Sequence, residues 1–562
     1  MTQVRGMSQD VIRLCCAAVM SFTMASTAFA GDGPDLIFVG GTIYTLDRNT
    51  TGATAVAVKD GRVVAIGAAD VLKLQDENTR LIDTRDLTVL PGLTDAHGHL
   101  RNLGRYRNNV QLIGSTSKQD VIERVRVFQK NVPADRWIRG RGWDQNDWDK
   151  KEFPTLTDLA GLDANPLYLR RVDGHACWVN QTALDLCGIT RDTPDPEGGR
   201  IIRDSDGVPT GVFIDRATEL ITSQIPDPSE DELDEIMTAA IAECHRVGLV
   251  GVHDAGINME MLASLRRIAA RGALTLRVYC MLSGDDPEVL AAELPRGPRM
   301  EADGMLTIRA VKLYADGALG SRGARLLEAY SDDPGNIGLL VDGEAAMNRV
   351  TERAFAAEFQ MCTHAIGDGG NRLVLDTYER VLGDDASSDH RFRIEHCQVV
   401  SLADIARFKQ LGVIPSMQPT HVTSDMYWAE DRLGSERLKG AYAWRLFLEQ
   451  GSPLVFGSDF PVESPNPFWG LYAAVTRQDH EHWPNGGWRP DQRVTLEEAM
   501  VAFTSAAAFA SFAEKNHGRL AVGMSADFTI IDRDVFRADA DALLETSVKM
   551  TVVSGNIVYD AR

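Results

Sequence analysis

Short apolar runs recur through the middle of the chain, and most of them end in polar residues. Helical patterns lie between several of these runs: residues 230–248 begin with acidic side chains and end at a glycine, and residues 259–272 and 344–359 are similar. Repeated strand-then-helix units predict an α/β fold with a closed, parallel (β/α)₈ TIM-type barrel. A short buried strand cannot be told from a buried helix by period alone, so the count of eight depends on these flanking patterns. The eight runs are residues 89–97, 249–256, 274–282, 307–317, 358–368, 391–398, 412–421 and 453–460.

Both ends of the sequence alternate apolar residues with small or polar ones, a pattern that predicts short β-strands joined by turns. We expect a small β-sandwich domain built from residues 31–90 and 515–562, with the barrel at residues 91–514 between its two parts. About 150 residues separate the first two barrel strands. A loop of that length rarely lacks structure, so an inserted subdomain over the barrel mouth is expected at about residues 105–235.

The first thirty residues differ from the rest. Arg5 and Arg13 precede an uncharged run that ends in Ala28-Phe29-Ala30, the pattern of a secretory signal peptide with cleavage after Ala30. The alternative is an uncleaved anchor. A signal peptide at residues 1–30 predicts a secreted or periplasmic protein, with no membrane span after cleavage. Export would also permit a disulfide between Cys177 and Cys187.

Composition narrows the classes of partner. The chain of 562 residues is 44% hydrophobic and 25% charged, which is ordinary for a globular protein, and its formal net charge is −22. An acidic surface argues against a nucleic-acid partner, whose phosphates need clustered Lys and Arg. The net charge says little about a small substrate, because a pocket is local. A small-molecule substrate is predicted as the partner, and a homo-oligomer stays open.

Candidate chemistry lies at the ends of the predicted strands. His97 and His99 are two positions apart and would face the same side of a strand, although they could also be two surface histidines. Imidazoles and a carboxylate suit Zn²⁺ or a similar divalent ion. Lys312 would repel a metal ion as an ammonium, but as a carbamate it could bridge two ions. The alternative for Lys312 is a salt bridge to Asp316 or Asp254. The remaining candidates at strand ends are His364, His396 and Asp459.

Several motifs occur together in one order along the chain: "DAHGHL", "VKLYADGALGSRGA", "THAIGD", "RIEHCQ", "SMQPTH" and "GSDFPVESPNP". With them the sequence resembles the amidohydrolase superfamily, and specifically the YtcJ-like group of amidohydrolase family 3. One position departs from the pattern, because Gly369 stands where the family usually has arginine.

The resemblance implies that His97, His99 and Asp459 hold one metal ion, that His364 and His396 hold a second, and that carboxylated Lys312 bridges them. Asp459 would act as general base and then general acid toward a metal-activated water. The implied reaction is cleavage of the C–N amide bond of an N-substituted formamide or N-acyl compound. The alternatives are hydrolysis of cyclic amides, carbamates or esters at the same metals, and a catalytically silent binding barrel.

Other side chains are candidates for substrate contact. His421, at the end of the seventh strand, is placed for oxyanion or substrate contact and counts as catalytic. His175 could touch substrate or be hydrogen-bonded within the insertion, and Trp143 and Asp144 could form a lid wall or the core of the insertion. The predicted substrate-binding residues are His175, Trp143, Asp144, Asp316 and Gln418.

Overall fold

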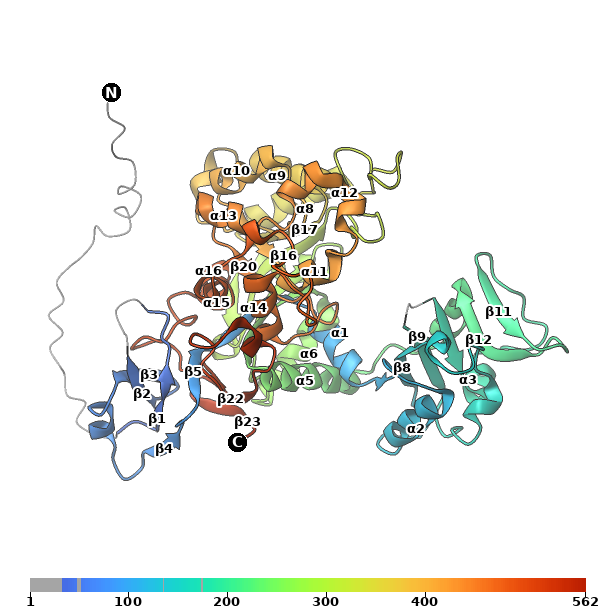
Figure 1. The fold of residues 1–562 in the computed structure, drawn as a ribbon, viewed down its shortest axis with the longest axis horizontal. Coiled ribbons are helices and arrows are strands. Elements are labelled where there is room, and N and C mark those ends of the chain that lie inside the picture. The colour runs from blue at the N-terminus through green and yellow to red at the C-terminus, as the bar shows by residue number, and fades with distance from the viewer. Residues whose placement is uncertain (1–32, 48–51, 135, 173–174) are drawn as a thin grey trace.

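A parallel barrel forms the centre of the molecule (Figure 1). The computed structural model describes residues 33–47, 52–134, 136–172 and 175–562. Each barrel strand pairs in parallel with the next, and a parallel bridge from Gly98 to Phe460 joins the last strand's end to the first. The prediction of a TIM-type barrel with eight parallel strands is therefore confirmed. In order, the strands are β6 (Leu93–Gly98), β13 (Leu249–Ile257), β14 (Arg277–Ser283), β16 (Leu306–Tyr314), β17 (Gln360–Ala365), β18 (Arg393–His396), β19 (Ile414–Met417) and β20 (Val455–Phe456).

Helices cover the outside of the barrel. The predicted helix at residues 230–248 is α5 (Glu230–Arg246), whose first turn is closed by a capping box between Ser229 and Glu232. Its apolar side is buried against the barrel, as an amphipathic helix requires. The others include α1 (Leu100–Arg107), α6 (Met259–Ala270), α7 (Pro287–Glu293), α8 (Glu344–Ala356), α9 (Asp368–Leu382), α10 (Leu402–Leu411), α11 (Pro419–Asp425), α12 (Ala429–Arg437), α13 (Trp444–Gln450), α14 (Pro467–Thr476), α15 (Leu496–Ala502) and α16 (Ser505–Ala510).

Strands from both ends of the chain share one sheet, as the alternating patterns predict. The two parts meet where β5 (Thr88–Pro91) pairs antiparallel with β21 (Phe528–Ile531). Arg277 of the barrel strand β14 lies 2.8 Å from Asp527, so an ion pair ties this sheet to the barrel. The other strands of the sheet are β1 (Leu36–Ile43), β2 (Ala53–Lys59), β3 (Arg62–Gly67), β4 (Arg80–Asp83), β22 (Val548–Val553) and β23 (Asn556–Asp560).

The long segment between the first two barrel strands folds as a separate sheet beside α1 and α5 (Figure 1). Trp143 and Trp178 are fully buried in its core. Cys177 and Cys187 are free thiols, so the predicted bridge is not formed. The elements of this inserted subdomain are β7 (Val110–Gln111), α2 (Lys118–Gln129), β8 (Ile138–Trp143), β9 (Leu167–Arg171), β10 (Ala176–Val179), α3 (Gln181–Leu186), β11 (Gly199–Arg203), β12 (Pro209–Asp215) and α4 (Glu219–Thr222).

The predicted signal peptide lies outside the described residues. None of the helices in the described part of the chain combines the length and the apolar character that a membrane span requires.

Candidate active site

The carboxyl ends of the barrel strands open into a cavity of about 930 Å³. Parallel strands end at the same side of a barrel, which is where barrel enzymes place their reactive groups. All the predicted metal ligands line this cavity together, although they are separated by more than 300 residues in the sequence. The lining includes His97, His99, Lys312, His364, His396, His421 and Asp459.

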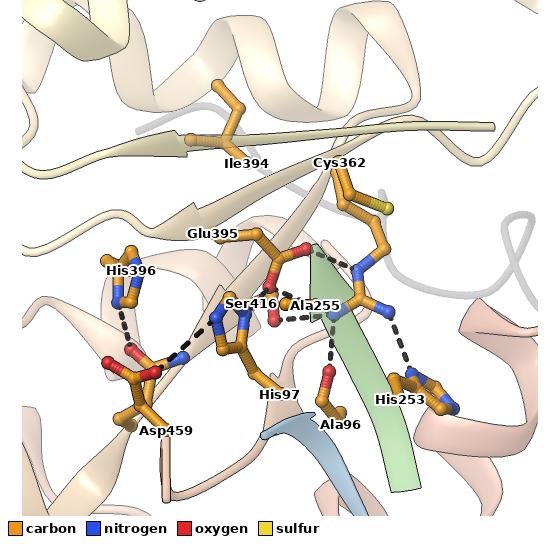
Figure 2. Close-up of polar contacts among 12 residues, drawn as sticks. Ala96, His97, His253, Ala255, Cys362, Ile394, Glu395, His396, Ser416 and Asp459 are labelled. Atoms are coloured by element: carbon orange, nitrogen blue, oxygen red, sulfur yellow. Dashed lines mark hydrogen bonds and ion pairs between the residues drawn. The ribbon is translucent and has the colours of Figure 1, made fainter. Parts of the chain in front are cut away.

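Asp459 is the carboxylate on which three imidazoles converge, and Figure 2 shows its contact with His97. Its Oδ1 lies 2.9 Å from Nε2 of His99 and 3.6 Å from Nε2 of His97, and its Oδ2 lies 3.8 Å from Nε2 of His421. Ligand atoms of His97, His99 and Asp459 lie within 4.8 Å of one another, and so do those of His396, His421 and Asp459. The group of His97, His99 and Asp459 has both the spacing and the donor types of a divalent-metal site.

The backbone around these ligands is locally strained. His396 has φ +76° and Asp459 has φ +60°, the left-handed region that side chains other than glycine rarely adopt. Such conformations persist only where surrounding contacts impose them, and they concentrate at functional sites. Here the Asp459 N–H donates to the His97 carbonyl at 2.8 Å. A Cβ on Gly457 would lie 2.5 Å from the His97 nitrogen, so only glycine permits this close approach.

A hydrogen bond at Nδ1 orients each of three histidines. His97 Nδ1 lies 2.6 Å from the carboxylate of Glu395, His99 Nδ1 lies 2.9 Å from the Ala255 carbonyl, and His396 Nδ1 lies 2.8 Å from Oε1 of Gln418. All three partners are acceptors, so Nδ1 carries the proton and Nε2 presents a lone pair, as a metal ligand must.

His421 is held in the opposite tautomer. The amide nitrogen of Gln398 donates to His421 Nδ1 at 3.0 Å, so the proton of the neutral ring is on Nε2. This nitrogen is buried and has no hydrogen-bond partner among the described residues. His421 therefore presents a hydrogen-bond donor to the cavity, which suits the predicted contact with a substrate oxygen.

Burial lowers the pKa of three of the candidate ligand histidines. It lowers the pKa of His97, and it lowers the pKa of His364 to about 3 with help from the positive charge of Lys312. The pKa of His396 is also well below its ordinary value, first because of burial and then because of the neighbouring histidines. Burial opposes the shift at His99, where the hydrogen bond to Asp459 and the charge of that carboxylate outweigh burial and raise the pKa. Burial alone would raise the pKa of Asp459, but the hydrogen bond to His99 and the nearby imidazoles outweigh it and hold that pKa well below the usual range. Neutral imidazoles and an ionised carboxylate are the forms that bind a metal ion.

Lys312 and His364 lie on adjacent strands. Lys312 is 1% exposed, and its Nζ lies 3.9 Å from the centre of the Tyr314 ring. In the described chain it forms no ion pair with Asp316 or Asp254, the alternative that the sequence left open. His364 Nε2 has no hydrogen-bond partner among the described residues and lies 3.5 Å from Oδ1 of Asp316.

The five predicted substrate-binding residues have structural contacts and do not line the cavity. Trp143 is buried in the inserted subdomain, where its indole N–H donates to the Leu169 carbonyl, and Asp144 caps a short helix and pairs with Arg171. His175 is exposed and bonded to Asp215. Asp316 accepts three backbone N–H groups, from residues 325, 366 and 367, and Gln418 orients His396. Substrate contact by these five side chains stays a prediction.

Sequence reasoning missed the network beneath His97 (Figure 2). Arg393 Nε lies 2.8 Å from Glu395 Oε1, and one terminal nitrogen, Nη2, donates to both the Ala96 carbonyl and Ser416. Arg393 also lies 2.8 Å from His253. The signal was present in "RIEH", where an arginine and a glutamate two positions apart lie on an otherwise buried strand. Charged side chains in such a place must pair with each other.

Comparison with known proteins identifies the family. A sequence model described as "Amidohydrolase family" matches residues 80–559, which is most of the chain. The chain belongs to the amidohydrolase family. This assignment confirms the predicted class, a metal-dependent hydrolase that acts on carbon–nitrogen bonds.

Named relatives of this amidohydrolase cover nearly its whole length. "Putative amidohydrolase YtcJ" of Bacillus subtilis is 32% identical over 93% of this chain and 99% of its own. "N-substituted formamide deformylase" of Arthrobacter pascens is 27% identical over 94% of this chain and 98% of its own. Among solved structures, an uncharacterized metal-dependent hydrolase from Pyrococcus horikoshii superposes with a TM-score of 0.73 at 27% identity, covering 90% of this chain and 99% of its own.

Proposed function

We propose that this amidohydrolase-family protein hydrolyses the C–N amide bond of a small N-acyl or N-substituted formamide compound at a divalent-metal centre. One observation carries the proposal: the buried Nε2 atom of His97, without a hydrogen-bond partner in the described chain, lies 3.6 Å from the Asp459 carboxylate, and both residues line the same cavity. A buried polar atom without a partner is unfavourable unless a bound ligand or metal ion supplies that partner. The similarity to a formamide deformylase supports the substrate class.

The residues present fit a metal ion of the Zn²⁺ type. His97, His99 and Asp459 would hold one ion, and His364 and His396 would hold a second. Carboxylated Lys312 would bridge them, because carboxylation turns its buried ammonium into an anionic oxygen ligand. Metal ions in such a site lower the pKa of a bound water and polarise a carbonyl oxygen.

The protein's own groups would then move the protons. Asp459 is ionised and lies among the ligands, so it can accept a proton from the attacking water and pass it to the leaving nitrogen. The Nε2–H of His421 would donate to the substrate carbonyl oxygen, where negative charge develops. The C–N bond breaks, the carbonyl carbon gains the water oxygen, and the products are a carboxylic acid and an amine.

The test combines metal analysis with a substrate panel. Elemental analysis of purified protein is expected to find one to two equivalents of a divalent metal, and a panel of N-formyl, N-acyl, lactam, carbamate and ester compounds is expected to show cleavage of open-chain amides first. Asp459→Asn should lower kcat by at least 1,000-fold, while His480→Ala, at an exposed histidine that does not line the cavity, should leave it unchanged. An active metal-free protein, or a fully active Asp459→Asn variant, would contradict the proposal.

Carboxylation of Lys312 has its own test. Protein exchanged into ¹³C-bicarbonate should show one carbamate resonance by NMR, and Lys312→Met should lose that resonance together with bound metal. A wild-type spectrum without the resonance would exclude the bridge but would leave the histidine and Asp459 ligands in place.

A further inference from the structure

The inserted subdomain supplies part of the wall of the active-site cavity. Arg139 and Arg141 of β8 and Tyr168 and Arg170 of β9 line it, and α1 adds Arg105. In the register between these parallel strands Arg139 pairs with Tyr168 and Arg141 with Arg170. Side chains two positions apart on a strand share a face, so one face of this small sheet presents three arginines to the site. The neighbouring positions Ile138, Leu167 and Leu169 face the core of the subdomain.

Two of the arginines that line the cavity have no side-chain partner among the described residues. Arg105 and Arg139 are half-buried, and neither makes a hydrogen bond or an ion pair within 4 Å in the described chain. Arg266 and Arg277, which are also largely buried, are each paired with carboxylates. Removing a guanidinium from water without an anion to pair with it is costly.

The charges around Arg105 and Arg139 also favour a bound anion. Burial, together with the positive charges of Arg101 and Arg139, lowers the pKa of Arg105 to about 10. Burial also lowers the pKa of Arg139. The acidic groups that act on Arg105, Asp227 and Glu260, are too far away to form an ion pair with it. An anion bound between Arg105 and Arg139 would offset the cost of burying the two guanidinium groups and would reduce the repulsion between them.

We propose that Arg105 and Arg139 bind a carboxylate on the substrate, so that the enzyme prefers N-acyl amino acids to uncharged amides. The inference rests on the proposed amide hydrolysis and names its substrate class. A cavity of about 930 Å³ has room for a molecule that reaches from the metal ligands to the inserted subdomain. The barrel side of the cavity carries the carboxylates Asp425, Asp459 and Glu463, so the lining has opposite charge at different places and fixes the orientation of such a substrate.

The experiment compares matched substrates with the metal-loaded enzyme. Each N-formyl or N-acetyl amino acid is assayed beside its own carboxamide, which has the same shape without the charge. We expect wild-type kcat/KM to be about 10- to 100-fold higher for the acid, the range of one or two charge-assisted hydrogen bonds. Arg105→Gln and Arg139→Gln should each raise KM for the acid by about tenfold or more and leave KM for the carboxamide unchanged, with kcat within about threefold.

Two variants serve as controls. Arg105→Lys retains the charge and should recover part of the loss. Arg126→Gln removes an exposed arginine of α2, which pairs with Glu123 on the surface, and should change neither substrate's KM. Equal effects of Arg105→Gln on acid and carboxamide, or a wild-type preference for the carboxamide, would overturn the inference while leaving amide hydrolysis intact.

A separate readout applies if no amide is cleaved, which would refute the proposed function. Calorimetric titration of the metal-loaded protein with N-acetyl amino acids and their carboxamides then decides the inference alone. Binding of the acid only, lost in Arg139→Gln, supports the arginine site, and equal or absent binding of both compounds refutes it.

Discussion

Glu395 is a buried carboxylate that contacts the candidate metal ligand His97 and does not line the cavity. It lies 2.6 Å from His97 Nδ1 and 2.8 Å from Arg393 Nε, and the side chains of all three residues are fully buried. Glu395→Gln keeps the shape but removes the charge that balances Arg393. The amide can place only one acceptor oxygen where the carboxylate has two. The substitution therefore leaves a buried guanidinium without its counter-ion and His97 with a weaker acceptor.

The expected effects follow from these contacts. Removing one partner of a buried ion pair costs about 3–5 kcal/mol of unfolding free energy. Removing the group that orients a metal-binding histidine costs about 10- to 100-fold in metal affinity. The pKa of Glu395 is well below its ordinary value: burial opposes this, but Arg393 and His97 outweigh it. The carboxylate's contribution is thus present above the unfolded pKa of about 4.5 and falls away as the pH drops toward the lower folded pKa.

Two measurements check this prediction. Urea unfolding of the barrel should show a lower midpoint for Glu395→Gln at pH 7, with a smaller difference from wild type below about pH 4. Competition with a chelator should show the loss of metal affinity. The matched control is Glu123→Gln, which breaks an exposed ion pair with Arg126 and should cost no more than about 1 kcal/mol. If Glu395→Gln unfolds at the wild-type urea concentration and retains wild-type metal affinity, the network does not support His97 in the way the contacts indicate.

Three further predictions concern the metal, the insertion and the N-terminus. Removing metal with a chelator should lower the unfolding midpoint of the barrel, and adding back metal at 100 times its Kd should restore about 2.7 kcal/mol, measured by thermal unfolding; equal midpoints would argue against a bound ion. Trp143→Ala should destabilise the inserted subdomain by about 3–5 kcal/mol and increase its hydrogen exchange while α5 stays protected, because the ring is fully buried; unchanged exchange would contradict a core role. Expression in an export-competent bacterium should give a mature protein that begins at Gly31, as shown by intact mass, whereas a retained Met1 would exclude cleavage after Ala30.

The barrel, and the gathering of the candidate ligands at one cavity, were predictable because each depends on local sequence. A short apolar run ending in a histidine predicts both a strand and the end at which the side chain emerges, and β17 with His364 follows that rule. Neither run length nor periodicity indicates what lies across the cavity from such a residue. His421 shows the limit: its position after β19 was predictable, but its tautomer depends on Gln398, which follows a different strand.

The part of the cavity wall that carries the arginines could not be predicted for the same reason. Arg105 and Arg139 are ordinary residues in sequence, and only the way the insertion lies against the barrel brings them to one cavity. Trp143 attracted attention because tryptophan is rare, yet its size is used to fill the core of the subdomain. An arginine is available for a ligand only if no carboxylate from a distant part of the sequence forms an ion pair with it. The three-dimensional structure is needed to see which arginines are left in that state.

The pairing of β5 with β21 gives the last strands of the chain a role at the metal ligands. Only Gly92 separates β5 from β6, the strand that carries His97, and the Thr529 hydroxyl accepts the backbone N–H of Leu93 at the start of β6. A protease cut or an early stop codon before residue 528 would therefore release the anchor of the first barrel strand. Loss of the C-terminal strands would therefore weaken metal binding at His97, more than 400 residues away in sequence. It would not simply remove a surface domain.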